Sequence, residues 1–441
     1  MTHFAEAREA AQKAIIEDLR ITSRIERACL IWDIQGRLKL LFKANDGEDT
    51  EDIKRYADSV LSQAAEAYWS GQIWIWSRNS SNPEIEVYKQ AWENATLISS
   101  PPDIKILDRH FSKSSWFSPV RDEPWPLNEK TPPILSFYSF KGGVGRTTAL
   151  VSLAIQLSRN GKRVAILDLD LEAPGLASIM PGVEGQVSDY GVVDYLLERM
   201  IINPANIVLE EYYYLVGDPN IVAEGPPIVV VPAGQIDEYY LEKLARIDYE
   251  ALYTYQIQGD PAPSPLGELL KHVRRSRDID YFLLDSRAGL HDLGGLSLSG
   301  ISHLDVVFGL DSDQSWRGLE VVVRFLGKDR IKSNQPKQLD CAIVLSMAPT
   351  PGNDREVART RFLEQSYNVF SYNYYSEEED GEAWVLPAMD TEGQPHYPIV
   401  LGFDPQIQRY DQVADIADRL TEGDFKTFAE SILERVGRAF A

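Results

Sequence analysis

The chain has few of the residues that build disulfide frameworks and cysteine metal clusters. Its 441 residues include two cysteines, Cys29 and Cys341, which lie far apart in the sequence. Two such distant thiols make neither a metal cluster nor a disulfide framework, and they fit a reducing compartment. No apolar stretch approaches the roughly 20 residues of a membrane span, and the first residues lack the apolar segment of a secretion signal. The composition therefore predicts a cytoplasmic protein.

Positive charge is also scarce. The 44 lysines and arginines are outnumbered by 67 aspartates and glutamates, which gives a net charge of −23. Such a chain repels nucleic-acid phosphates and anionic membranes unless a local patch overrides the average. The balance argues against nucleic-acid and membrane partners. An apolar fraction of 44% and nine tryptophans indicate packed cores, and the length predicts about two or three domains.

The first 125 residues have the pattern of a separate α+β module. Helical periodicity over 4–20 and 50–69 flanks two short apolar runs around Gly36, which predict a hairpin. The proline-rich segment 119–133 indicates a linker. We therefore expect an α+β module over 1–125 and a second domain over 126–441. The module has no enzyme signature, and its tryptophans are typical of a core and of a protein-partner interface.

A glycine-rich loop over 140–148 organises the second domain. The apolar run 134–140 precedes it and a helical pattern over 149–157 follows it, which is the strand–loop–helix context of a phosphate-binding loop. Glycines allow the backbone to turn tightly and to direct consecutive N–H groups at phosphate oxygens. The helix that follows adds its N-terminal partial positive charge. The residues expected to contact phosphate are Gly142, Gly143, Val144, Gly145, Arg146, Thr147 and Thr148.

This loop departs from the pattern G-x-x-x-x-G-K-[ST] at two positions. Phe140 stands at the first glycine position, and Arg146 replaces the lysine that reaches the β- and γ-phosphates. A second cation, Lys141, opens the loop. A guanidinium can hold two phosphate oxygens, but its reach and planarity differ from those of lysine. Two interpretations therefore stay open: slow hydrolysis of a bound nucleotide, and nucleotide binding without hydrolysis.

Aspartates follow two of the predicted buried strands. Asp168 and Asp170 end the strand that begins near 163, and Asp285 ends the strand over 279–285. Strands that alternate with helical segments predict a doubly wound, mostly parallel α/β sheet, in which ligands bind beyond the carboxyl ends of the strands. Carboxylates placed there, opposite a cationic loop, are what a site for ATP and Mg²⁺ needs.

Residues 141–148 fit the pattern K-G-G-x-G-[KR]-[ST]-[ST], which resembles the deviant Walker A motif of the MinD/ParA superfamily of P-loop ATPases. The order of the other motifs extends this resemblance over roughly residues 132–436. The resemblance implies a role for each residue of the site. Thr147, Asp168 and Asp285 are assigned to Mg²⁺ and its water shell, Gly289 N–H to the γ-phosphate, and Asp170 to the attacking water. Pro349 falls at the position that recognises the base, without the usual asparagine, which leaves the choice of adenine less secure than phosphate binding.

The resemblance also implies a mechanism. ATP would drive a face-to-face homodimer in which Lys141 crosses to the partner's nucleotide, so that Lys141, Asp170 and Arg146 form the catalytic set. The chain would then be a molecular switch that regulates a partner protein, through residues 1–125, in a bacterial signalling or defence system. Three alternatives stay open: a tyrosine kinase of the same superfamily, a DNA-partitioning ATPase and a non-hydrolysing nucleotide-bound scaffold.

Overall fold

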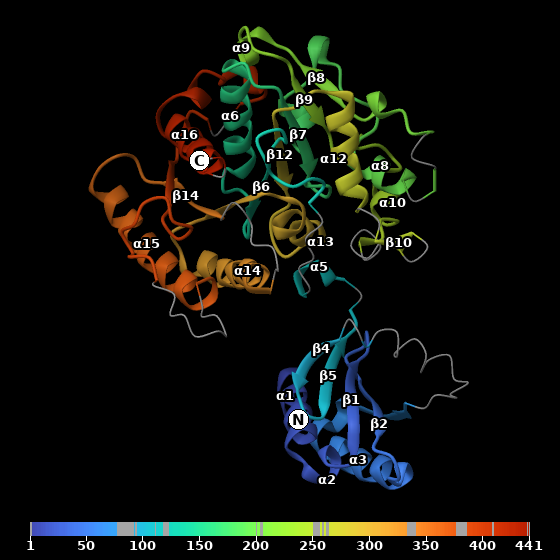
Figure 1. The fold of residues 1–441 in the computed structure, drawn as a ribbon. Helices are drawn as coiled ribbons and strands as arrows, with labels where there is room; N and C mark the ends of the chain where they lie inside the picture. Colours follow the sequence, from blue (N-terminus) through green and yellow to red (C-terminus); the bar gives the residue numbers. More distant parts are fainter. Residues whose placement is uncertain are drawn as a thin grey trace. The chain divides into compact units, whose positions relative to one another are not determined.

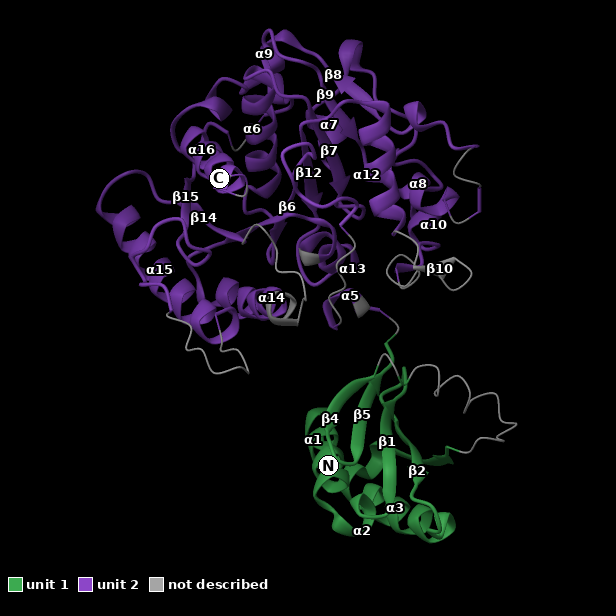
Figure 2. Ribbon diagram, in the orientation of Figure 1, with its two compact units in different colours: residues 1–111 green, residues 112–441 purple. Residues whose placement is uncertain are grey.

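The computed structural model describes residues 2–440 except 77–91, 93, 94, 111, 118–122, 200, 203–205, 250–255, 258, 259, 262, 263, 333–340, 376–385, 408, 409 and 439. The chain forms two compact units, residues 1–111 and 112–441 (Figure 2). Cys29 and Cys341 are buried in different units.

The first unit is a mixed five-stranded sheet with helices packed against it. Its strand order is β3-β2-β1-β5-β4, with β1 antiparallel to β2 and parallel to β5. Alternate β1 residues such as Leu30 and Trp32 pack with α1 and α3, because successive side chains of a strand point to opposite faces. The bounds are α1 Phe4–Glu17, α2 Leu19–Thr22, β1 Ile25–Trp32, β2 Leu38–Ala44, α3 Thr50–Ala65, η1 Glu66–Tyr68, β3 Trp69–Ile75, β4 Thr96–Ser99 and β5 Asp103–Asp108.

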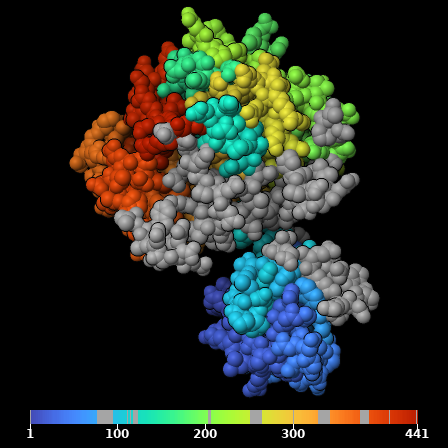
Figure 3. All heavy atoms as spheres, in the orientation of Figure 1, coloured from blue at the N-terminus to red at the C-terminus, as the bar shows by residue number. Residues whose placement is uncertain are grey.

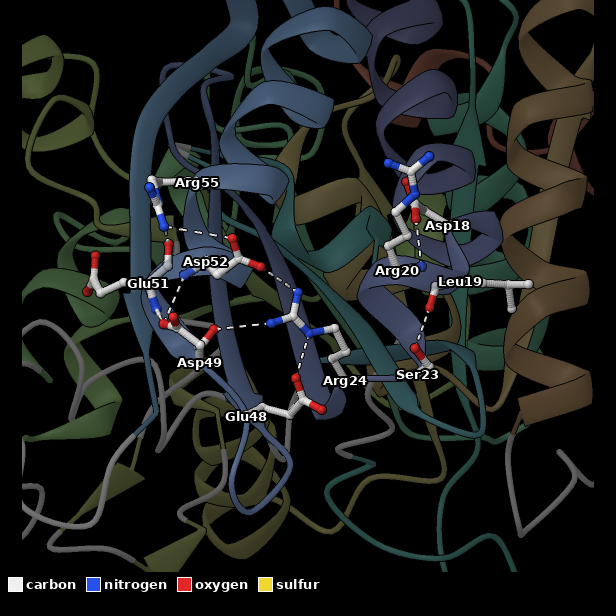
Figure 4. A network of polar contacts seen from close by, with 10 residues as sticks. All are labelled: Asp18, Leu19, Arg20, Ser23, Arg24, Glu48, Asp49, Glu51, Asp52 and Arg55. Atoms are coloured by element: carbon white, nitrogen blue, oxygen red, sulfur yellow. Dashed lines mark hydrogen bonds and ion pairs between the residues drawn. The ribbon is translucent and has the colours of Figure 1, made fainter.

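Polar contacts tie the start of α3 to the turn before β1 (Figure 4). Arg24 pairs with Glu48 at 2.6 Å and with Asp52 at 2.9 Å. Asp49 caps α3, since its side chain accepts hydrogen bonds from the backbone of Glu51 and Asp52. The hairpin predicted around Gly36 is present as β1 and β2.

The second unit contains an eight-stranded sheet in the order β15-β14-β13-β6-β12-β7-β9-β8. Figure 1 shows its central strands β6, β12 and β7. The described pairs are parallel except β8 with β9. The strands are β6 Ile134–Ser139, β7 Val164–Leu169, β8 Tyr214–Val216, β9 Ile228–Val231, β12 Tyr281–Ser286, β13 Leu304–Gly309, β14 Ala342–Ala348 and β15 Ile399–Gly402, with a separate short pair β10 Gln256–Ile257 and β11 Asp260–Pro261. The predicted doubly wound α/β sheet is confirmed.

Helices cover both faces of this sheet. Leu135 and Phe137 of β6 pack with α6 and α16 on one face, while Ile134 packs with α8 and α12 on the other. Figure 3 shows α16 (red) and α12 (yellow) at the surface of this unit. The helices are α5 Ser114–Phe117, α6 Arg146–Arg159, α7 Leu176–Ile179, η3 Val183–Gly185, α8 Val192–Glu198, η5 Leu209–Glu211, α9 Pro219–Val222, α10 Tyr240–Leu244, α12 Pro265–Ser276, α13 Asp292–Gly295, η6 Leu296–Ile301, α14 Asp313–Lys332, α15 Asn353–Asn373, η7 Val413–Asp415, η8 Arg419–Thr421 and α16 Gly423–Arg438.

The division between the units lies at 111/112, earlier than the 125/126 boundary expected from the prolines. The reason is packing rather than composition. Lys113, Ser115 and Trp116 bond to residues of the second unit that lie more than 170 positions further along the chain. The proline-rich stretch also belongs to that unit, where Trp125 packs on Phe282.

Candidate functional site

The glycine loop joins β6 to α6, as its sequence predicts. Gly143 and Gly145 have φ angles of +72° and +77°, a backbone region that side chains with a Cβ rarely adopt. A Cβ built on Gly142 or Gly143 meets no atom within 4 Å, so this part of the loop is open to a ligand. Thr147 and Thr148 lie in the first turn of α6, half-buried. The loop and helix together have the form of an anion cradle.

Arg146 points at the carboxylates at the neighbouring strand ends. Its Nε donates to Asp285 Oδ1 at 2.7 Å, and its Nη2 donates to Asp170 Oδ2 at 3.1 Å. The side chain is 8% exposed. Burial acts to lower the pKa of Arg146, but the carboxylates of Asp285 and Asp170 outweigh burial and raise it. In this structure the guanidinium therefore neutralises carboxylates, whereas the sequence led us to expect it at the phosphates.

The residues expected to hold Mg²⁺ lie close together in the structure. Thr147 Oγ1 donates to Asp285 Oδ2 at 2.7 Å, and β7 lies beside β12 with Asp168 in register with Asp285. Asp168 is 1% exposed and accepts hydrogen bonds from the backbone N–H groups of Asp170, Gly175 and Leu176 at 3.1, 3.3 and 3.3 Å. Burial, and next the Asp285 carboxylate, raises the pKa of Asp168 to about 8. Burial also raises the pKa of Asp285, although Arg146 opposes it.

This donor set fits Mg²⁺. The Thr147 hydroxyl and the carboxyl groups of Asp168 and Asp285 supply oxygen ligands of the kind that the ion prefers, and Mg²⁺ usually keeps several waters and adds phosphate oxygens. Within the described ranges, no three His, Cys, Asp or Glu side chains form a ready-made metal cage.

The remaining predicted residues surround the loop. Lys141 Nζ donates to Gln314 Oε1 of α14, and Gly289 N–H donates to Ser139 O at 3.1 Å. Gly289 has a φ of +81°. Its amide is thus bonded to the protein backbone here, and contact with a γ-phosphate would require that bond to break.

The end of β14 lies against the loop. Ser346 Oγ donates to Val144 O, and a Cβ on Gly145 would lie 3.6 Å from the Met347 side chain. Pro349 is exposed just beyond, and its carbonyl accepts from Arg355 Nε at 2.6 Å. The structure therefore brings Ser346 and Met347, which precede the expected base-recognition residue, to the edge of the glycine loop.

The sequence does not predict two sets of contacts near the glycine loop. Phe140 packs against α14, and a Cβ on Gly318 would lie 2.0 Å from its ring, so a bulky residue at the first glycine position is matched by a glycine far along the chain. A buried hydroxyl chain runs from Ser136 to Ser286 at 2.9 Å and on to Ser297 at 2.7 Å. No local sequence signal pairs these residues, because they meet only through the order of the strands.

These features define a P-loop nucleotide-binding protein of the α/β class: a glycine loop opens a helix, and carboxylates face it from adjacent parallel strands. The chain belongs to the CobQ/CobB/MinD/ParA nucleotide binding domain family, whose model matches residues 135–430. The MinD/ParA resemblance predicted from the glycine loop and the aspartates is confirmed at the level of the family.

Similar proteins agree with this family. An uncharacterised ATP-binding protein of Methanocaldococcus jannaschii is 27% identical over 200 residues, which is 45% of this chain and 61% of that protein. The septum site-determining protein MinD of Synechocystis is 24% identical over 233 residues, 50% of this chain and 74% of that protein. The chain thus spans about three fifths of the archaeal relative.

Among solved structures, the cell division ATPase MinD of Pyrococcus furiosus aligns with a TM-score of 0.43 and 19% identity, over 69% of this chain and 99% of that one. In the described part of the molecule, no helix combines the length and apolarity needed to cross a bilayer.

Proposed function

We propose that the chain is an Mg²⁺-dependent ATPase that acts as a nucleotide switch. One observation carries the proposal: Arg146, Thr147, Asp170 and Asp285 meet beside an open glycine loop, at the ends of three adjacent parallel strands. In this role the amides of 142–148 bind the phosphates, while the Thr147 hydroxyl, Asp285 and Asp168 hold Mg²⁺. The bound ion would supply positive charge to the phosphate oxygens.

Hydrolysis assigns separate tasks to the chain's own residues. Asp170 orients the attacking water by accepting a hydrogen bond from its O–H group. Arg146 exchanges its carboxylate partners for phosphate oxygens, which a planar guanidinium can bind two at a time. The Gly289 amide leaves Ser139 O for the γ-phosphate, so the loop that carries it differs between nucleotide states.

In the proposed sandwich homodimer, Lys141 would exchange a bond within its own chain for the nucleotide of the partner subunit. Its side chain bonds to Gln314, whose helix α14 begins next to the glycine loop. A cation that crosses to a partner's nucleotide would stabilise charge in the transition state. A dimer that forms only with ATP would make turnover depend on assembly, and the 1–125 module would pass this state to a partner protein.

A non-hydrolysing scaffold is the second candidate, because Arg146 occupies the carboxylates that a hydrolytic site would use for Mg²⁺ and water. A tyrosine kinase has less support. Tyr212–Tyr214 and Tyr374–Tyr375 are each less than 8% exposed, so they are not accessible phosphate acceptors. Tyr372, which precedes the second cluster, is 83% exposed.

Light scattering with no nucleotide, ADP and ATP, with phosphate release measured in parallel, tests the proposal. We expect a dimer with ATP·Mg²⁺ alone and phosphate release that Lys141→Ala and Asp170→Asn each reduce by about 100-fold or more. Dimerisation without phosphate release would favour the scaffold. If Lys141→Ala changes neither quantity, the sandwich mechanism is wrong.

A further inference from the structure

We define residues 287–291 as the Gly289 loop. The segment that follows the first unit, residues 112–117, is bonded to the last residue of this loop, His291, and to Asp292 after it. Lys113 meets Asp292 twice, through its backbone N–H and through its Nζ at 2.8 Å. Ser115 Oγ donates to Asp292 O at 2.9 Å, and Trp116 Nε1 donates to His291 O at 2.7 Å. We call residues 112–117 the connecting segment.

The fit between these two pieces depends on small residues. A Cβ on Gly295 would lie 2.5 Å from Ser115 Oγ and 3.0 Å from the Trp116 ring, and one on Gly294 would lie 3.4 Å from that ring. Contacts under 3.0 Å force a neighbour to move. Gly295 thus permits a close approach of Ser115 that a Cβ at this position would disturb.

The connecting segment is held in a costly conformation. Lys113 has a φ of +71°, which for a residue with a Cβ costs of order 1–3 kcal/mol. The Asp292 side chain that receives it is 10% exposed, whereas the Lys113 side chain is 38% exposed, so the ion pair is shielded from solvent and salt on the carboxylate side only. The strained backbone is therefore retained together with a specific partner.

The same contacts reach the nucleotide site. Trp116 packs on Phe325 at 4.9 Å and on Tyr138 of β6 at 5.9 Å, measured between ring centroids. The Tyr138 hydroxyl donates to Gly289 O at 2.9 Å. The Gly289 loop is therefore fixed at its glycine by β6 and at its far end by the connecting segment.

We propose that Lys113 and Trp116 are positioning residues of the nucleotide site. They set the position of the Gly289 loop through Asp292 and His291, and a movement of Gly289 toward the γ-phosphate alters the connecting segment in turn. Because the segment continues directly into residues 1–111, it is the covalent route by which nucleotide state reaches the first unit. The inference rests on the proposed function, since it requires the Gly289 loop to respond to ATP.

Hydrogen exchange of the full chain, read by mass spectrometry, tests this coupling. The nucleotide-free protein is compared with the protein bound to Mg²⁺ and a non-hydrolysable ATP analogue, and nucleotide affinity is measured separately. We expect exchange in 112–117 to change together with exchange in 287–295. Lys113→Ala should abolish the response in 112–117, Lys113→Arg should restore it, and the exposed Lys162→Ala should leave it intact.

The steady-state kinetics should separate positioning from binding. We expect Lys113→Ala and Trp116→Phe to lower kcat by about 5- to 150-fold, the usual size of coupling between sites, with a smaller change in nucleotide affinity. Trp116→Phe removes the donor to His291 O and keeps an aromatic ring, so it serves if Lys113→Ala does not fold.

The outcomes discriminate between the two proposals. If the nucleotide binds and exchange changes in 287–295 but not in 112–117, the coupling is wrong and the proposed function stands. If both variants keep the wild-type response in 112–117, the positioning role is wrong. If the wild-type chain binds no ATP analogue, the proposed function and this inference fall together.

Discussion

At the scale of single residues, Arg146 stands where the P-loop pattern has a lysine, and it pairs with the carboxylates of the site. The guanidinium has two carboxylate partners, at 2.7 and 3.1 Å, and almost no solvent contact. Arginine suits this position because its planar group donates to two acceptors at once. Arg146, Asp285 and Asp170 therefore form a buried ion-pair cluster beside the open glycine loop.

Arg146→Ala should destabilise the nucleotide-free second unit by about 3–5 kcal/mol, because it leaves Asp285 buried without its cation. Arg146→Lys keeps the charge and should lose less. Urea unfolding measures both variants. We also expect added Mg²⁺ to stabilise the alanine variant more than the wild type, since the ion can replace the lost charge. Equal stability of Arg146→Ala and wild type would contradict the pairing.

A second residue-scale prediction concerns pH. His396 is fully buried; its Nε2–H donates to Met389 O at 3.1 Å, and its Nδ1 accepts from Tyr375 at 2.8 Å. Burial lowers the pKa of His396. The unfolded chain then binds more protons below its ordinary pKa of about 6.5, so stability falls as the pH drops from about 6.5 toward the lowered value, by at most about 1.4 kcal/mol per pH unit.

The measurement is urea unfolding at pH 7.5 and at pH 5.5 for wild type and His396→Gln. Glutamine keeps a donor and an acceptor but does not titrate in this range. We expect the variant to lose less stability than the wild type between the two pH values. Equal losses would show that His396 does not contribute to the pH dependence.

At the scale of secondary-structure elements, the glycine loop is supported by α14 through an interlocking pair. The Phe140 ring occupies the space that a Cβ at Gly318 would need, 2.0 Å from the nearest ring atom. Lys141, the next residue, bonds to Gln314 one turn earlier on the same helix. The position of the loop is thus tied to α14 at two consecutive residues.

Gly318→Ala should therefore be destabilising, by about 1–3 kcal/mol for overpacking, although alanine is favoured over glycine by about 1 kcal/mol inside a helix. In a Phe140→Ala background the same substitution should become neutral or stabilising. A double-mutant cycle measured by thermal unfolding gives the coupling energy. Additive effects would mean that the two side chains do not interlock.

At the scale of the whole molecule, the boundary between the units can be tested with fragments. The fragment 112–441 retains the contacts of Lys113, Ser115 and Trp116 with α13 and the loop before it, whereas 123–441 loses them. We expect the longer fragment to be more stable by about 2 kcal/mol or more, since it keeps the hydrogen bonds to Asp292 and His291 together with the Lys113–Asp292 ion pair. Thermal unfolding of both fragments, with ATP binding as a second readout, makes the comparison.

Identical stability of the two fragments would favour a boundary at 125/126.

The C-terminal helix α16 belongs to the second unit in either case. Phe425, Phe428 and Ile432 are buried in the core that it shares with α6 and the sheet. The amphipathic pattern of this helix is thus explained by packing on the sheet.

The sequence by itself determined the class of the sheet, the glycine loop and the strand-end aspartates. These are local features: glycines with positive φ, buried strands that end in aspartate, and the apolar periods between them act over a few residues. The hairpin around Gly36 and the first-turn threonines of α6 follow from the same local rules.

Only the tertiary structure decided which partners those residues have. The pairing of Arg146 with Asp285 and Asp170, the packing of Phe140 on Gly318, and the bonding of Lys113 to Asp292 all join positions that are 24 or more residues apart. Such contacts depend on strand order and on the packing of side chains in three dimensions, which composition and spacing do not specify. The physical reason is that a buried charge or a close backbone approach is satisfied by whichever group the fold brings near, wherever that group lies in the chain.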